Sequence, residues 1–175
     1  MEINLGHREL ETIIFSLEDC ERNKEISHEL GKSKSSQIRT HIANNEYLND
    51  ETVDLLLKDS SVEVLRAIVS RDYTPSRMKK EDLERLIEIG DTELLIIIAG
   101  KISEYVDEFG ICKMDWLCEK LITQEDPVIR YMLAENDYTP DHFLGKLTHD
   151  EDINVAEKAM RALIDKDVDW IEDLS

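Results

Sequence analysis

The residues in this chain best placed for chemistry are carboxylates near its C-terminus. Asp165, Asp167 and Asp169 alternate with other residues, like the first three ligand positions of a calcium-binding EF-hand loop. The sixth position of such a loop needs glycine for a sharp turn and is Trp170 here, and the twelfth would fall beyond Ser175. We therefore interpret these carboxylates as a solvated acidic segment available to a partner, and predict no metal site.

The histidines and cysteines do not form a pattern typical of a metal site or of a disulfide framework. His142 and His149 lie seven positions apart on a predicted helix, but a zinc site needs a third nitrogen or sulfur ligand, so both are interpreted as exposed side chains. Cys20, Cys112 and Cys118 are an odd number without a C-x-x-C pair, which argues against a disulfide framework. Cys118 replaces an aliphatic residue in the pattern described below and is expected to be buried, whereas a reactive thiol stays an alternative for Cys112. No nucleophile elbow, phosphate loop or dinucleotide fingerprint is present, so we predict no catalytic residue, no cofactor and no enzyme.

The overall charge of the chain argues against partners that are themselves negatively charged. Asp and Glu number 40 against 21 Lys and Arg, a formal net charge of -19. Such a surface repels nucleic-acid phosphates and anionic membranes, and no basic patch offsets it. No apolar stretch is long enough to span a bilayer, and the N-terminus lacks a signal-peptide pattern. We expect a cytoplasmic protein that binds neither nucleic acid nor membrane directly.

An apolar pattern recurs five times and predicts the elements that position these residues. Each copy has an anchor, an apolar residue four positions later on the same helix face, and then a residue that is small in most copies. The anchors are Ile38, Val64, Leu94, Ile129 and Val155; their partners are Ile42, Ile68, Ile98, Leu133 and Ala159; the following residues are Ala43, Val69, Ala99, Ala134 and Met160. A fixed recurrence of this length is typical of stacked helical repeats.

A second helix is predicted in each copy. It carries the apolar residues Val53, Leu56 and Leu57, then Leu83, Leu86 and Ile87, then Cys118, Leu121 and Ile122, and last Leu144 and Leu147. About four extra residues in the second copy and about nine in the third are expected in the turns, at 76–80 and 103–113. Tyr47, Tyr73 and Tyr138 each follow an anchor by nine positions, and we expect their rings to wedge between the paired helices.

The pattern resembles a known repeat family. An anchor followed by arginine (Ile38-Arg39, Ile129-Arg130), an alanine five positions on, and Thr-Pro opening a leucine-bearing helix resemble the leucine-rich repeat variant family and, more broadly, HEAT-like α-solenoids, over about residues 36–164. The resemblance implies an all-α, right-handed solenoid of about five two-helix repeats. We expect one domain, 1–175, with N-terminal capping helices in 1–31 and an acidic C-terminal cap or tail in 165–175.

We expect this solenoid to act as a non-enzymatic scaffold for a protein partner, with its acidic surface favouring basic partners. An acidic mimic of DNA that inhibits a nucleic-acid-binding protein is the alternative. Candidate partner-binding residues lie beside the anchors and in the acidic segment: Leu65, Arg66, Leu95, Ile96, Arg130, Tyr131, Asp165, Asp167 and Asp169.

Two of these positions have further interpretations. Arg130 follows Asp126 by four residues, which suits a structural ion pair within one helix. Leu95 and Ile96 belong to a run without a polar face, so we expect the insertion around Tyr105 and Phe109 to cover them; a homodimer or a partner is the other possibility.

Overall fold

All regular secondary structure described here is helical. The computed structural model describes residue 12 and residues 20–72, 74, 77–105 and 114–172, and no strand occurs among them. The expected all-α class is confirmed. The chain forms two compact units, Met1–Thr74 (unit 1) and Pro75–Ser175 (unit 2). The expected single domain stays a prediction.

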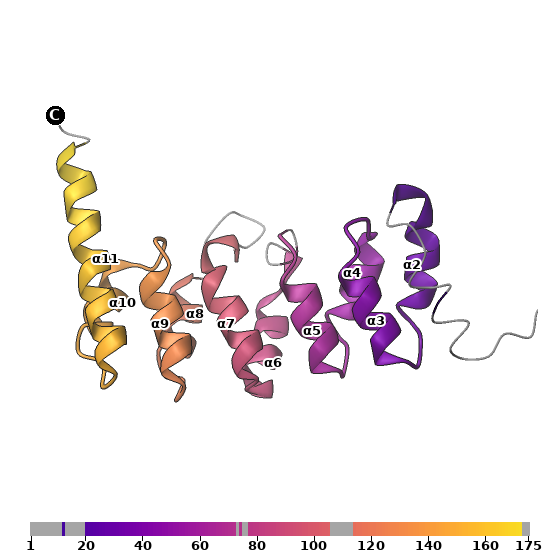
Figure 1. The fold of residues 1–175 in the computed structure, drawn as a ribbon, viewed down its shortest axis with the longest axis horizontal. Coiled ribbons are helices and arrows are strands. Elements are labelled where there is room, and N and C mark those ends of the chain that lie inside the picture. The colour runs from indigo at the N-terminus through magenta and orange to yellow at the C-terminus, as the bar shows by residue number, and fades with distance from the viewer. Residues whose placement is uncertain (1–11, 13–19, 73, 75–76, 106–113, 173–175) are drawn as a thin grey trace, which may run out of the picture. The chain divides into compact units, whose positions relative to one another are not determined.

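Unit 1 is built around α3. Its helical elements are η1 (Glu21–Asn23), α2 (Lys24–Leu30), α3 (Ser36–Ala43), α4 (Asp50–Leu56) and α5 (Val62–Val69). The helix α3 packs against α2, α4 and α5 (Figure 1). The amide of Thr52 donates to Asn49 Oδ1 at 2.9 Å, so Asn49 caps the N-terminus of α4. The first turn of α4 also carries the acidic residues Asp50 and Glu51.

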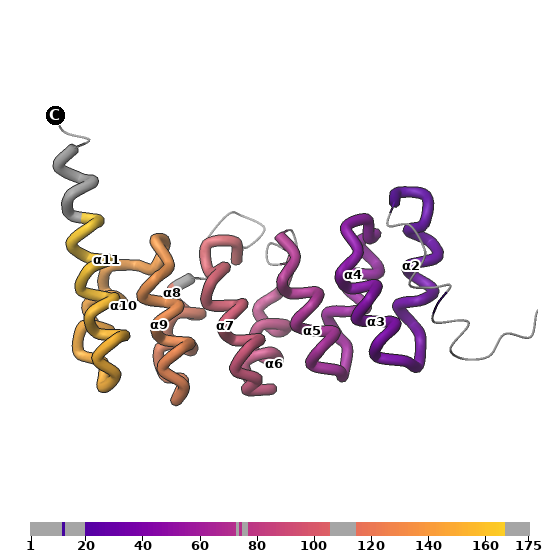
Figure 2. Tube along the Cα trace, in the orientation of Figure 1, coloured from indigo at the N-terminus to yellow at the C-terminus, as the bar shows by residue number. Residues whose placement is uncertain are grey.

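Unit 2 places three sequence-aligned helices side by side. Its elements are α6 (Lys80–Ile89), α7 (Thr92–Gly100), η3 (Ile102–Glu104), α8 (Met114–Leu121), α9 (Pro127–Glu135), α10 (Asp141–Leu147) and α11 (Ile153–Glu172). The helix α7 packs against α9, α9 packs against α11, and α10 also packs against α11 (Figure 2). In α11 the backbone is described to Glu172 and the side chains to Lys166.

The recurring apolar pattern forms the core, as predicted. All five anchors and their partners four positions later are at most 5% exposed. The following residue is buried in the first four copies, whereas Met160 is 54% exposed. Second-helix residues are buried too, including Cys118, although Ile87 and Ile122 are only partly so. These positions could be predicted because an α-helix repeats every 3.6 residues, so the residues that face the core recur on one side. Burial of that apolar side is a large favourable contribution to the free energy of folding.

The tyrosines of the turns differ from expectation. Tyr138 is 66% exposed and Tyr47 39% exposed, so neither ring wedges between helices; Tyr73 lies outside the described residues. In the turn before α10, the buried Thr139 hydroxyl donates to the Leu133 carbonyl at 2.6 Å.

The extra residues are expected in turns at 76–80 and 103–113. Among the described residues, 77–79 precede α6, which begins at Lys80, and Ser103 and Glu104 belong to η3. Residues 76 and 106–113 lie outside the described residues, so their placement in turns stays a prediction. Leu95 and Tyr105 are buried, while Phe109 lies outside the described residues, so the proposed cover of Leu95 by the insertion stays a prediction. No helix among the described residues is long and apolar enough to cross a membrane.

Candidate partner-binding site

The residues directly after the anchors do not form an exposed surface. Leu65 is 0% exposed and Leu95 is 1% exposed, which corrects their assignment as partner-binding residues. Their neighbours Arg66 and Ile96 are partly exposed. The position after an anchor lies on the same side of the helix as the small residue four positions further on, and that side is buried in these copies.

Arg130 occupies the same buried position and has a structural role. Its Nε donates to Asp150 Oδ2 at 2.7 Å and its Nη2 to Asp150 Oδ1 at 2.8 Å. Its Nη1 donates to the carbonyls of Gln124 and Glu125 at 2.7 and 2.9 Å. Arg130 therefore ties the turn before α9 to the turn before α11, and the side chains of Arg130 and Asp150 are each 7% exposed. We call this pair the unit 2 clamp.

The ion pair expected between Arg130 and Asp126 does not form. Asp126 Oδ1 instead accepts from the Val128 amide at 2.9 Å and caps α9, with Pro127 at the first helical position. Asp126 is thus occupied by the helix start, and Arg130 is free to reach a carboxylate 20 residues further along the chain.

Unit 1 contains the same arrangement. Arg39 donates to both carboxylate oxygens of Asp59, at 2.6 and 2.9 Å, and to the Ser33 carbonyl at 2.7 Å. The hydrogen bond with Asp59 raises the pKa of Arg39. Burial acts to raise the pKa of Asp59, but hydrogen bonds from Arg39 and the Ser61 amide outweigh it and hold that pKa below its usual value. The hydrogen bond from Arg130 lowers the pKa of Asp150 in the same way.

A hollow of about 380 Å³ between α9 and α11 is the strongest candidate for contact with a partner. We call it the α9–α11 groove. Tyr131, Glu135 and Asp137 line it from α9 and the turn that follows, and Lys158, Arg161, Ala162, Asp165 and Lys166 line it from α11. Of the residues predicted to bind a partner, the structure brings Tyr131 and Asp165 together here. The side chains of Asp167 and Asp169 lie outside the described residues.

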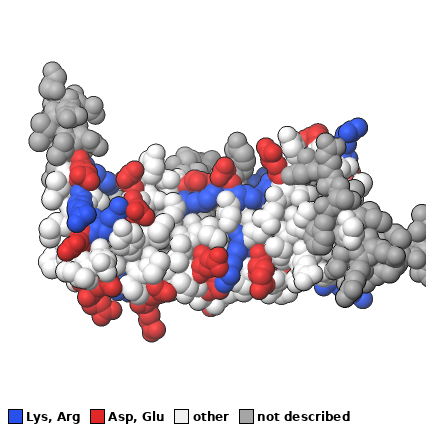
Figure 3. Space-filling view, viewed as in Figure 1, with Lys and Arg blue, Asp and Glu red and all other residues white. Residues whose placement is uncertain are grey.

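Positive and negative charges are mixed in this groove. Lys158 Nζ lies 3.2 Å from Glu135 Oε1 and 5.9 Å from the centre of the Tyr131 ring. Lys166 Nζ donates to the Thr139 carbonyl at 2.6 Å and lies 3.2 Å from Asp141 Oδ1. Figure 3 shows Lys and Arg beside Asp and Glu over the part of unit 2 that holds α9 and α11. The groove is therefore close to neutral within a strongly acidic chain.

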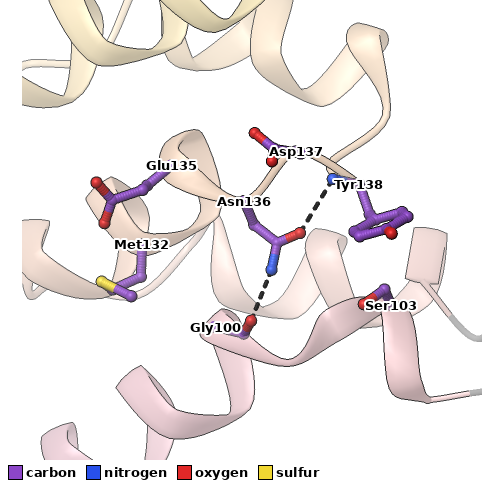
Figure 4. A pocket seen from close by; sticks show the side chains of 7 residues that line it. All are labelled: Gly100, Ser103, Met132, Glu135, Asn136, Asp137 and Tyr138. Atoms are coloured by element: carbon purple, nitrogen blue, oxygen red, sulfur yellow. Dashed lines mark hydrogen bonds between the residues drawn. The ribbon is translucent and has the colours of Figure 1, made fainter.

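A second hollow, of about 250 Å³, adjoins the groove because both are lined by Glu135 and Asp137. Asn136 stands at its centre (Figure 4): its Nδ2 donates to the Gly100 carbonyl at 2.7 Å, and its Oδ1 accepts from the Tyr138 amide at 3.0 Å. Asn136 thus joins the end of α7 to the turn after α9. The exposed ring of Tyr138 and the partly exposed Met132 complete the lining.

The groups considered for metal or thiol chemistry are dispersed. Within the described residues no three His, Cys, Asp or Glu side chains converge. Asp165 lies in the helix α11 and not in a loop, so the EF-hand geometry does not arise. His142 and His149 are both exposed, and His149 falls after the end of α10. Cys112 lies outside the described residues.

Sequence reasoning missed the lysine and arginine side chains of α11 as lining residues, since it weighed only the acids of this segment. Their spacing did contain the signal. Lys158, Ala162, Asp165 and Lys166 follow one side of a helix at intervals of three and four residues.

Comparison with protein-family models gives no match, and neither do comparisons with curated protein sequences and with solved structures.

Proposed function

We propose that this protein is a non-enzymatic scaffold that binds a protein partner, and that its helices form an α-solenoid of about five two-helix repeats. The serial packing of α7, α9 and α11, with every anchor buried, supports the repeat architecture. The likeness to leucine-rich repeat variant proteins belongs to the same proposal, as does the cytoplasmic location expected from the absence of a membrane-spanning stretch and of a signal-peptide pattern in the sequence.

The α9–α11 groove is the observation that carries the proposal. Tyrosine and arginine are enriched at the energetic centres of protein interfaces, and the groove offers Tyr131 and Arg161 together. Its charged neighbours Glu135 and Lys158 already pair with one another, so they can form a polar rim around an apolar contact.

The formal charge of -19 favours a basic partner. Such a field speeds encounter with a positively charged surface and suppresses contact with nucleic acid. A DNA mimic would need an unbroken series of carboxylates along one face. On the face drawn in Figure 3, acidic and basic side chains of the described residues lie beside one another, which favours the scaffold.

The test is capture of partners from the native host by the full chain, at about 0.05 M and about 0.5 M salt, with quantitative mass spectrometry. A basic protein retained at low salt and released at high salt is expected, because long-range attraction is screened within about 8 Å at 0.15 M. Tyr131→Ala and Arg161→Ala should each weaken binding of the purified partner about tenfold, whereas Tyr47→Ala, an exposed tyrosine of unit 1, should not. Capture of no protein at either salt concentration, or equal effects of all three variants, overturns the proposal.

A further inference from the structure

The helix α11 has an apolar surface on the side away from its buried residues. Ile153, Met160 and Ile164 are 66%, 54% and 56% exposed. Their spacing of seven and four residues puts them on one helix face, which we call the outer stripe. Ala156 and Leu163, both partly exposed, widen it along one edge. Val155 and Ala159, which are buried, lie on the opposite face and hold α11 to the rest of unit 2.

One residue of the outer stripe, Met160, corresponds to a position that is covered elsewhere in unit 2. Met160 aligns with Ala99 of α7 and Ala134 of α9, both 0% exposed. These alanines lie in helices that each pack against the next one, α7 against α9 and α9 against α11. Asn136, the residue that follows α9, also joins the two helices at this point, since its Nδ2 donates to the Ala99 carbonyl at 3.4 Å. At Met160 the outer stripe therefore continues the helix-to-helix interface, whereas Ile153 and Ile164 align with Pro127 and Tyr138, which are partly exposed and 66% exposed.

We infer that the outer stripe of α11 binds an amphipathic helix of a basic partner protein, which packs on α11 as α11 packs on α9. This inference rests on the proposed scaffold function and adds a second contact surface, on the helix that also lines the α9–α11 groove. A packed helix would bury the exposed apolar stripe, and an exposed stripe of this kind is typical of helix recognition.

The charges beside the outer stripe select a basic helix. Glu157 is exposed on its flank, and Glu151, close to the start of α11, is 87% exposed at its side chain. The nearest described basic side chains of α11 already lie beside acids: Arg161 is 3.7 Å from Glu157, and Lys158 is 3.2 Å from Glu135. A second copy of this chain would bring a net charge of -19 against the same surface, whereas lysines flanking a partner's apolar face would meet carboxylates.

The test uses a dye-labelled synthetic peptide of three heptads, about 21 residues, with Leu at positions a and d and Lys at e and g. Lysines at e and g discourage the peptide from pairing with itself. One control peptide has the same composition in scrambled order, and another carries Glu in place of Lys. Fluorescence anisotropy with the full chain should give a Kd at least tenfold lower for the patterned basic peptide than for either control.

Protein variants locate the site. Met160→Lys and Ile164→Lys should each raise the Kd for the patterned peptide at least tenfold. Val128→Lys introduces the same charge at an apolar residue of α9 that is 48% exposed, and should change the Kd less than twofold. Circular dichroism of all three variants checks that they are folded.

Three results with the purified chain overturn the inference: no preference for the patterned basic peptide, equal losses in all three variants, or a wild-type dimer in light scattering that Met160→Lys converts to a monomer. The last result would assign the outer stripe to a second copy. If a partner is captured from the host but Met160→Lys leaves its binding unchanged, the inference fails and the scaffold proposal stands. If no host protein is captured, the scaffold proposal fails whatever the peptide does.

Discussion

The unit 2 clamp provides the sharpest test of what holds the repeating helices together. The substitution Asp150→Asn keeps the shape of the side chain but removes its charge and one of the two oxygens that accept from Arg130. Arg130 keeps its hydrogen bonds to the carbonyls of Gln124 and Glu125. The variant therefore isolates the charged interaction.

The expected loss follows from burial and geometry. Breaking a buried ion pair by removing one partner costs roughly 3 to 5 kcal/mol, since the other charge is left without compensation. Here Glu151 Oε1 lies 3.5 Å from Arg130 Nη2 and can take over part of the pairing, although its side chain is 87% exposed. We expect Asp150→Asn to lower the free energy of unfolding of unit 2 by about 2 to 3 kcal/mol.

A double variant shows how removal of the whole ion pair compares with removal of one of its charges. Leucine stands at the Arg130 position in two other copies, Leu65 and Leu95, and is buried in both. Arg130→Leu together with Asp150→Leu should therefore be less destabilising than Asp150→Asn alone, because it buries no unpaired charge. The matched control is Glu84→Gln, which weakens an exposed pair at 3.9 Å with Lys80 in α6 and should cost at most about 0.5 kcal/mol.

Urea denaturation of the full chain, followed by tryptophan fluorescence, is a suitable assay because both tryptophans, Trp116 and Trp170, belong to unit 2. Where two variants unfold with the same dependence on urea concentration, the difference between their unfolding midpoints gives the difference in the free energy of unfolding. A loss below about 0.5 kcal/mol for Asp150→Asn, equal to that of Glu84→Gln, would refute the claim that the clamp stabilises unit 2.

Three further outcomes are expected. The pKa of Asp150 is lower when folded, so the stability from the clamp is present above its unfolded pKa of about 3.9 and is lost as pH falls through the folded pKa; wild type and Asp150→Asn should converge in acid denaturation. Ile98→Ala should cost roughly 2 to 5 kcal/mol in urea denaturation, because Ile98 is fully buried. Gly90→Ala should cost about 1 kcal/mol, since Gly90 ends α6 with φ at 67°, while Gly145→Ala, within α10 with open space around it, should not destabilise; equal effects of the two in the same assay would contradict this reason.

The sequence was sufficient for the helices and their buried faces, and insufficient for the side chains between helices. Ile38 and Ile42 could be placed in the core because two apolar residues one helical turn apart define a face. Tyr138 could not, since an aromatic residue in a turn packs only if the turn folds toward the helices, and here Asn136 holds the turn to the end of α7 with the Tyr138 ring exposed. Tyr131 and Lys158 belong to different helices, so no spacing along one helix could show that they share a groove.

The role of Arg130 was predictable in principle from two distant positions taken together. Arginine follows the anchor in two copies, Arg39 and Arg130, and each is accompanied by an aspartate 20 residues later. Where the anchor is followed by Leu65 or Leu95, the residue five positions before the next anchor is Ile89 or Gln124 and carries no charge. A buried guanidinium without a carboxylate costs several kcal/mol, so the two positions change together. An arginine that repeats with its own aspartate is therefore evidence of a buried structural pair.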